Sequence, residues 1–264
     1  MRDRRVGVLA GAALVVLLAV LYLPVAYLVY ASVNDNPLGT AWRGFTGRWF
    51  ADAARSQEVR RSFWVSTRLA AAASLGAVLV GTTAAIAARR SMWMRRASGV
   101  LAGMRVGVPE IIIATGLAVA LPLVGMRFGF RTMLVAHVAL LSAYVVLVVG
   151  ARAAGADRAM EEAALDLGAN RWQMLRDVVL PDLRPAIVSS GLLAAAFSFD
   201  DVALSASLRG PRDTTLPVYL FSVVQRRVTP AIYAVGTMVV VGGAVMFAAA
   251  MVANRAPRRP DLSR

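Results

Sequence analysis

Apolar residues in this 264-residue chain are collected into six long runs, and this feature constrains the possible folds most strongly. A helix of about 20 apolar residues crosses the roughly 30 Å hydrocarbon core of a bilayer. The runs therefore predict an all-α membrane protein with six transmembrane helices. The expected spans are residues 6–31, 66–88, 99–123, 133–150, 187–208 and 231–253.

We expect a single transmembrane domain over residues 1–264, because six spans leave no room for a soluble domain of ordinary size. Hydrophobic residues make up 58% of the chain, compared with about half in a typical soluble protein. The first apolar run follows arginines, as in a secretory signal, but it is longer than the apolar core of such a signal and no clear cleavage site follows. We interpret it as a retained anchor.

Arginine supplies all the basic side chains, since the chain has no lysine, and the net charge is +14. Arginine clusters at residues 2–5, 89–96, 152–184 and 255–264 fall on one side of the six-span arrangement, and fewer lie on the other. Because basic residues are enriched in cytoplasmic loops, we expect a multi-pass protein of the bacterial inner membrane with both termini in the cytoplasm. The charge is interpreted as topology and contact with lipid phosphates, with no role in binding nucleic acid.

Several kinds of chemistry are excluded by composition. The absence of cysteine excludes disulfides and thiolate sites, and the absence of lysine excludes a Walker A loop, so ATP use requires another chain. A single histidine, His137, is expected to pack inside a helix bundle and cannot form a histidine-rich metal cluster. We expect no metal site and no catalytic residue in this chain.

The longest segment on the predicted cytoplasmic side, residues 151–185, divides into two short helices. The first carries an apolar stripe at helical spacing, formed by Met160, Ala163, Ala164 and Leu167. Glu162 follows Arg158 by four residues and can pair with it. We expect Gly168 to end this helix in a left-handed conformation.

Asn170 is expected to cap the second short helix, whose stripe consists of Trp172, Leu175 and Val179. Pro181 and Pro185 are expected to stop this helix before the fifth span. Two helices with one apolar face are typical of an element on the membrane surface, and also of one that docks into a groove of a partner protein.

This segment also contains a motif whose fixed residues are Glu162, Ala163, Ala164, Gly168, Leu180 and Pro181. The motif resembles the EAA loop, EAA-x3-G-x9-I-x-LP, of membrane subunits of bacterial binding-protein-dependent ABC importers. Only the Ile is replaced, by Val178. The resemblance implies a type I importer permease fold in which residues 157–185 form cytoplasmic coupling helices seated in an ATP-binding subunit.

The resemblance also implies a role for individual residues of the motif. The small side chains of Ala163 and Ala164 would allow close approach to the ATP-binding subunit. Gly168 would form the bend, and Glu162 would anchor the helix through polar contacts.

The similarity extends over nearly the whole chain and is closest to the spermidine/putrescine permease C subunit family. The stretches that carry it are Leu21–Asp35, Trp42–Phe50, Val108–Ala114, Ser198–Pro211 and Leu216–Pro230. It implies polyamine import together with a second permease subunit, a dimer of ATP-binding subunits that hold ATP and Mg, and a periplasmic or lipid-tethered binding protein. No cofactor is expected on this chain. Glu110 stands where the family usually has Asp.

Acidic residues inside predicted spans are costly to bury, so a functional role is the first interpretation. Glu110 follows Pro109, which is expected to open a helical turn in the third span and place the carboxylate near a transport pathway. A purely structural pair between Glu110 and Arg105, in the same span, is the alternative.

Asp200 and Asp201 are adjacent, and neighbours on a helix point about 100° apart, so only one is expected to face the pathway. The other would cap a break, bond to a nearby serine, or meet the partner subunit. The stripe of Ser198, Asp201 and Ser205 is predicted to face the pathway. Trp64 and Tyr219 are candidate aromatic walls for a cationic substrate.

The sequence thus predicts the permease subunit of an ATP-driven importer, most consistent with polyamine uptake. An importer of the same type for ferric iron, thiamine or a phosphonate is an alternative, although an anionic substrate would be repelled by Asp200 and Asp201. An intramembrane aspartyl protease is another, but it needs carboxylates that converge from different segments. A purely structural subunit leaves the acids unexplained.

Overall fold

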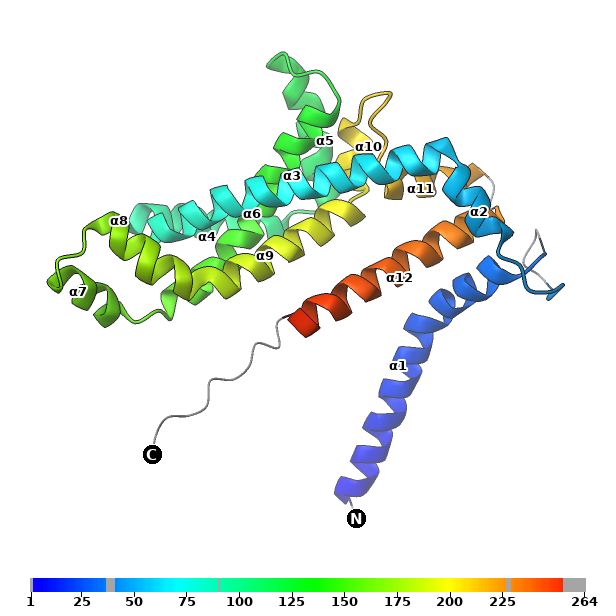
Figure 1. The fold of residues 1–264 in the computed structure, drawn as a ribbon, viewed down its shortest axis with the longest axis horizontal. Helices are drawn as coiled ribbons and strands as arrows, with labels where there is room; N and C mark the ends of the chain where they lie inside the picture. Colours follow the sequence, from blue (N-terminus) through cyan, green and yellow to red (C-terminus); the bar gives the residue numbers. More distant parts are fainter. Residues whose placement is uncertain (1, 37–40, 90, 227–228, 254–264) are drawn as a thin grey trace. The chain divides into compact units, whose positions relative to one another are not determined.

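The computed structural model describes residues 2–36, 41–89, 91–226 and 229–253, with the side chains of residues 2–10, 95, 101–102, 104–106, 158 and 246–253 left outside the description. Regular structure in these ranges is helical (Figure 1). The chain divides into two compact units. The first joins Met1–Arg60 to Ser222–Arg264, and the second is Arg61–Phe221. The arginines at both termini, on which the predicted orientation depends, lie outside the described side chains.

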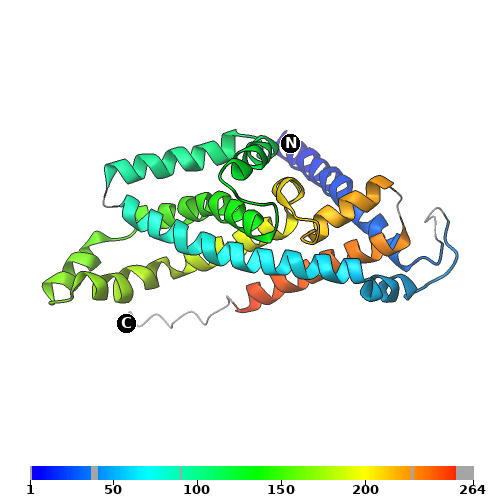
Figure 2. The same ribbon diagram turned by 90° about the horizontal axis from the view of Figure 1, so that it is seen from above.

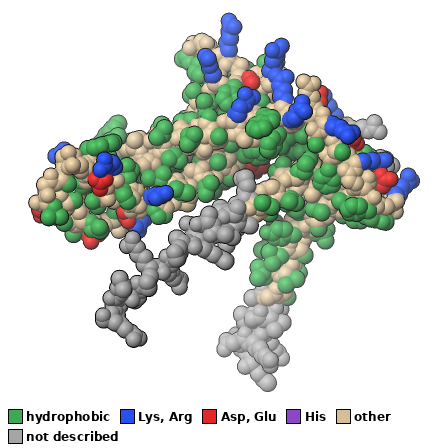
Figure 3. All heavy atoms as spheres, viewed as in Figure 1, with side chains coloured by type: hydrophobic (Ala, Val, Ile, Leu, Met, Phe, Trp, Pro, Cys, Tyr) green, Lys and Arg blue, Asp and Glu red, His purple; other side chains and the backbone are tan. Residues whose placement is uncertain are grey.

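In the first unit, α1 (Arg2–Val33) packs against α12 (Pro230–Ala253). The Tyr27 and Tyr233 rings meet edge to face at 6.3 Å between centroids. The short helix α2 (Arg48–Arg55) is tied to the end of α1, because the Trp49 indole donates to the backbone oxygen of Asn34 at 2.9 Å. The described part of α1 exposes mainly hydrophobic side chains, as expected of a segment that faces lipid (Figure 3).

The second unit contains the remaining helices. They are α3 (Gln57–Ala88, with its first turn in the first unit), α4 (Met92–Gly107), α5 (Glu110–Leu123), α6 (Phe130–Ala154), α7 (Arg158–Asp166), α8 (Arg171–Met174), a π-helix (Leu175–Val179), α9 (Leu180–Asp200), α10 (Ala203–Leu208) and α11 (Leu216–Arg226, whose part after Phe221 belongs to the first unit). Helices α3, α6 and α9 run side by side (Figures 1 and 2), and their buried side chains form one apolar cluster.

Small residues allow α3 to approach α6 closely. Ala73, Ala77 and Ala85 of α3 are buried in the apolar cluster with residues of α6. A Cβ atom added at Gly81 would lie 2.5 Å from the Cβ of Val145, which is too close for two carbon atoms that are not bonded to each other. Close packing of helices through small residues is the main way that helices associate in a bilayer.

Four described helical segments are long and apolar enough to cross a membrane: Gly11–Val33, Gln57–Ala88, Phe130–Ala154 and Arg171–Asp200. Glu110–Leu123 and Pro230–Val245 are apolar but shorter. All six predicted runs are therefore mainly helical. Helix α5 has 14 residues, fewer than a full span needs, whereas α12 has 24 residues, of which Pro230–Val245 have described side chains. The multi-pass helical architecture is confirmed and the exact count of six is not.

Two predicted spans differ from the structure in a way that affects the site. Residues 99–123 do not form one helix, because α4 ends at Gly107 and α5 begins at Glu110. Pro109 explains the break, since it lacks a backbone N–H and disfavours a helical conformation at Val108. The predicted span 187–208 is also interrupted, between the end of α9 at Asp200 and the start of α10 at Ala203.

The prediction that Pro181 and Pro185 stop the second coupling helix is wrong. Helix α8, the π-helix and α9 follow one another without a gap, and both prolines lie within α9. The π-helix ends two residues before Pro181. Because Pro181 cannot donate to the carbonyl of Asp177 and its ring crowds that carbonyl, a local widening of the helix accommodates it.

Candidate functional site

Three acidic residues predicted from the sequence meet at one cavity of about 400 Å³ in the second unit. Glu110 comes from the start of α5, Asp200 from the end of α9, and Asp201 from the break before α10. Residues of α6 also contribute to the wall. Carboxylates from two separate parts of the chain thus face a common space, which favours a cation there.

Both helix breaks contribute to this arrangement. Glu110 occupies the first turn of α5, where the positive end of the helix dipole stabilises a carboxylate. The predicted opening of the helix at Pro109 is confirmed. The alternative partner of Glu110, Arg105, has a side chain outside the described residues, so the structural pair stays untested.

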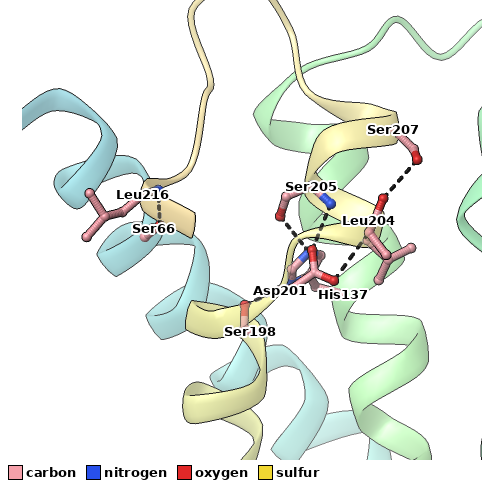
Figure 4. Close-up of polar contacts among 9 residues, drawn as sticks. Ser66, His137, Ser198, Asp201, Leu204, Ser205, Ser207 and Leu216 are labelled. Carbon is pink, nitrogen blue, oxygen red and sulfur yellow. Dashed lines mark hydrogen bonds and ion pairs between the residues drawn. The ribbon is translucent and has the colours of Figure 1, made fainter. Parts of the chain in front are cut away.

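Asp201 is held by the start of α10. Its two carboxylate oxygens accept hydrogen bonds from the backbone N–H groups of Leu204 at 3.3 Å and Ser205 at 2.7 Å. The His137 ring lies 3.4 Å from one of these oxygens (Figure 4). The Asp201 side chain is 5% exposed. Asp201 therefore caps α10, satisfying backbone donors that the break in the helix would leave without partners.

His137 of α6 is the centre of this buried polar cluster. Its Nδ1 lies 2.8 Å from the Ser198 hydroxyl, and its Nε2 lies 3.4 Å from the Ser205 hydroxyl (Figure 4). All three side chains are buried. The ring joins the end of α9 to the start of α10, so it fixes both sides of the break. This matches the predicted role of His137 as a packing residue with satisfied polar atoms.

The predicted stripe of Ser198, Asp201 and Ser205 is thus directed at His137. Asp201 also lines the cavity, whereas Ser198 and Ser205 do not. The prediction requires residues 187–208 to form one helix, and the break between α9 and α10 changes the direction of the Asp201 side chain. Asp200, the neighbouring acid, is exposed and lines the cavity. Of the two adjacent acids, Asp200 is thus the exposed one, whereas the carboxylate of Asp201 is engaged with α10.

Aromatic residues also line the cavity, and they are not the predicted ones. Tyr144 of α6 and Phe197 of α9 have ring centroids 4.8 Å apart. Neither Trp64 nor Tyr219 lines this cavity, and Trp64 instead contacts Phe63. The missed residues had a signal in the sequence, since Tyr144 follows His137 by seven positions and Phe197 precedes Asp200 by three, which places each pair on one helix face.

The coupling segment adopts the predicted helix–glycine–helix form. The Asp157 carboxylate caps α7 by accepting from the N–H of Ala159 at 2.9 Å. Gly168 has φ +88°, and the bonds from Gly168 N to Leu165 O and from Ala169 N to Ala164 O make a Schellman motif. The left-handed conformation predicted for Gly168 is confirmed.

Asn170 caps the second helix, as predicted. Its side-chain oxygen accepts from the N–H groups of Trp172 and Gln173, and the Gln173 side chain accepts in return from the N–H of Asn170. This reciprocal pair is a capping box, which fixes the direction in which the chain enters α8.

The apolar side chains of the coupling segment are divided between two faces. Met160, Leu167 and Trp172 are 63%, 89% and 66% exposed, whereas Val179 is buried and Ala164 and Leu175 pack against the α3–α6–α9 cluster. Glu162 and Ala163 are also exposed. Pairing of Glu162 with Arg158 remains a prediction, because the Arg158 side chain lies outside the described residues.

Comparison with known families gives one match over most of the chain. Residues 77–259 match the family described as the inner membrane component of binding-protein-dependent transport systems. This region includes the complete coupling segment and all the acids that line the cavity.

Two curated proteins show similarity over nearly their full length. The spermidine/putrescine transport system permease protein PotC of Haemophilus influenzae is 35% identical over 236 residues, covering 88% of this chain and 91% of the relative. The putrescine transport system permease protein PotI of Escherichia coli K12 is 34% identical over 229 residues, covering 83% and 81%.

A solved structure shares the fold. A chain of a bacterial ABC transporter involved in the import of the acidic polysaccharide alginate superposes with a TM-score of 0.70 at 16% identity, and 98% of each chain is covered. At this identity the similarity concerns the fold alone.

Proposed function

Since this chain belongs to the family of inner membrane components of binding-protein-dependent transport systems, we propose that the solute its transporter imports is a polyamine. The chain is a permease subunit of an ABC importer. Two relatives at 34–35% identity are named as putrescine or spermidine/putrescine permeases, and this supports the proposed substrate class.

The observation that carries the proposal is the cavity that Glu110, Asp200 and Asp201 share with Tyr144 and Phe197. A polyamine bears positive charges separated by methylene groups. Carboxylates attract the charges, and aromatic rings favour both ammonium groups and the apolar carbons between them. An anionic solute would be repelled by the same three carboxylates.

We propose that Glu110 and Asp200 meet the substrate and that Asp201 and His137 hold the helix break in position. Asp200 is exposed at the cavity, whereas the oxygens of Asp201 are engaged with α10. Ser198 and Ser205 support His137 from either side. Trp64 and Tyr219 are left out of the proposed site, since they do not line the cavity.

The proposed complex contains a second permease subunit, two ATP-binding subunits that hold ATP and Mg, and an extracytoplasmic binding protein. The exposed side chains of Met160, Leu167 and Trp172 would enter a groove of one ATP-binding subunit, with Glu162 and Ala163 at the contact. Both termini would then lie in the cytoplasm with the coupling segment. ATP-driven movement of this segment would open the cavity to each side in turn.

Uptake by the complete complex tests the proposed substrate. The complex, purified with its own ATP-binding subunits and binding protein, is reconstituted in proteoliposomes that contain ATP, and entry of radiolabelled spermidine and putrescine is measured. We expect uptake that excess unlabelled polyamine abolishes and that phosphonates, thiamine and ferric iron leave unchanged. ATP-driven uptake of one of these other solutes, with no uptake of polyamine, would overturn the proposal.

A further inference from the structure

An ion pair connects the coupling segment to a helix that is distant from it in the sequence. The Arg89 guanidinium, at the end of α3, lies 2.5 Å from a carboxylate oxygen of Glu161 in α7. The two side chains are only 14% and 20% exposed. Partial burial reduces screening by water and salt, so this pair is stronger than a typical surface pair.

The residues around the Arg89–Glu161 pair show that it connects separate helices. Arg89 and Glu161 line a hollow of about 460 Å³ together with Leu165, Met174 and Val179, which belong to α7, α8 and the π-helix. In Figure 3, charged side chains of both signs gather at the end of the unit formed by α7 and α8. The pair is thus a polar contact between α3 and the helices that precede α9.

The residues at this contact differ from those of the family motif. Glu161 directly precedes Glu162, the first residue of the EAA motif, and the two differ in exposure. Glu161 is turned toward Arg89 of its own chain, whereas Glu162 is exposed. Neighbouring acids therefore serve different contacts, one within the subunit and one available to a partner.

The opposite end of α3 reaches the substrate site. From Arg89 to Ser66 the helix extends about 35 Å, at 1.5 Å per residue. The Ser66 hydroxyl accepts from the N–H of Leu216 at 2.8 Å (Figure 4). Leu69 is fully buried in a second apolar cluster that includes Leu204 of α10, the helix capped by Asp201. Helix α3 thus contacts the coupling segment at one end and the wall of the cavity at the other.

We propose that the Arg89–Glu161 ion pair makes α3 a second lever between the coupling segment and the cavity, in addition to the continuous helix from α8 through α9. Movement of α7 draws the end of α3 with it, and α3 shifts α10 through the apolar cluster that contains both Leu69 and Leu204. This inference rests on the proposed function of the coupling segment, and it assigns Arg89 and Glu161 as positioning residues.

Spin labels on the two levers test this link in the assembled complex. The chain has no cysteine, so Arg68→Cys on α3 and Ser189→Cys on α9 each give one labelling site in this subunit, at an exposed position. Spectra are recorded without nucleotide and with ATP and vanadate in the wild-type background, in Arg89→Glu, in Glu161→Arg and in the charge exchange of both residues.

In the wild-type background we expect both labels to respond to nucleotide. In each single variant the α3 response is lost and the α9 response is kept, because α9 remains joined to α8 by the backbone. The charge exchange restores the α3 response. Uptake falls at least about fivefold in the single variants, within the usual range of coupling between sites, and recovers in the exchange.

A matched control uses the Arg48–Asp35 pair, 3.0 Å apart in the first unit, with Arg48→Glu, Asp35→Arg and their exchange. These variants are expected to leave the α3 response intact. The link is refuted if the α3 label responds equally in the single variants, if both labels lose their response together, or if the exchange fails to restore it in an assembled complex. A wild-type complex whose labels respond but which takes up no polyamine contradicts the proposed substrate and leaves the lever standing.

Discussion

Asp200 and Asp201 are adjacent in the chain but have different environments in the structure. Asp201 satisfies two backbone donors at the start of α10 and contacts His137, whereas Asp200 is exposed at the cavity. Asp201 therefore contributes to the stability of the break between α9 and α10, and Asp200 is available to a cationic substrate.

Alanine substitutions separate these two roles. We expect Asp200→Ala to reduce polyamine uptake on the order of tenfold while the melting temperature of the complex is unchanged. Asp201→Ala removes hydrogen bonds to a charged acceptor, which costs about 1.5–3 kcal/mol, so it lowers the melting temperature as well as uptake. Size-exclusion thermal assays and uptake assays measure both quantities. A stable Asp201→Ala complex beside an unstable Asp200→Ala complex would reverse the assignment.

The backbone conformation at position 168 favours glycine. Its φ of +88° is disfavoured for side chains with a branched Cβ, and no heavy atom outside its immediate neighbours lies within 4 Å of the position that its Cβ would occupy. Gly168→Val is thus expected to distort the turn between α7 and α8 without a clash and to abolish ATPase stimulation by the binding protein. Gly168→Asn is the matched control, because Asn tolerates this conformation. Normal stimulation in Gly168→Val would exclude the turn from coupling.

At the scale of elements, the coupling segment was predictable and the membrane helices were less so. The ends of α7 and α8 depend on local interactions, namely the cap by Asn170 and the left-handed Gly168, and both have strong sequence signals. The break at Asp201 has no comparable signal, because it depends on contacts with His137, 64 positions earlier in the chain. The direction predicted for the Asp201 side chain assumes a continuous helix and therefore does not hold, although Asp201 is among the residues that line the cavity.

The prolines of the coupling segment show a similar limit. Pro181 lies in a helix that runs on in both directions, with the π-helix ending just before it. A proline normally ends a helix interior because it removes one hydrogen bond and crowds one carbonyl. Local widening and packing of Val179 and Leu183 in the α3–α6–α9 cluster preserve the helix here. This tertiary contribution cannot be read from the local sequence.

Helix α3 requires glycine where it crosses α6. In Gly81→Ala the new Cβ would lie 2.5 Å from the Val145 Cβ and 2.8 Å from the backbone oxygen of Ser142, so the helices must separate. Overpacking of this kind costs about 1–3 kcal/mol, and we expect a lower melting temperature of the purified complex. Gly116→Ala on α5 is the control, since its Cβ would meet nothing within 4 Å. Equal melting temperatures for the two variants would contradict the packing described here.

At the scale of the whole molecule, the second unit combines a coupling segment and an acid-lined cavity in one packed set of helices. The two sites are joined by the helix that runs from α8 into α9 and, in our proposal, by α3 through Arg89 and Glu161. Helices that are packed on one another respond to displacement as rigid elements, which suits a subunit that converts movement at one end into a change of access at the other.

Covalent capture of the substrate is the most direct test of the claim that the cavity conducts a polyamine. A photoreactive spermidine analogue is supplied to the complete complex during ATP hydrolysis, irradiated, and its attachment sites are identified by mass spectrometry. We predict labelling of cavity residues such as Tyr144 and Phe197, suppressed by excess spermidine and reduced in Asp200→Ala. Labelling confined to other helices, in a complex that still imports spermidine, would contradict this claim.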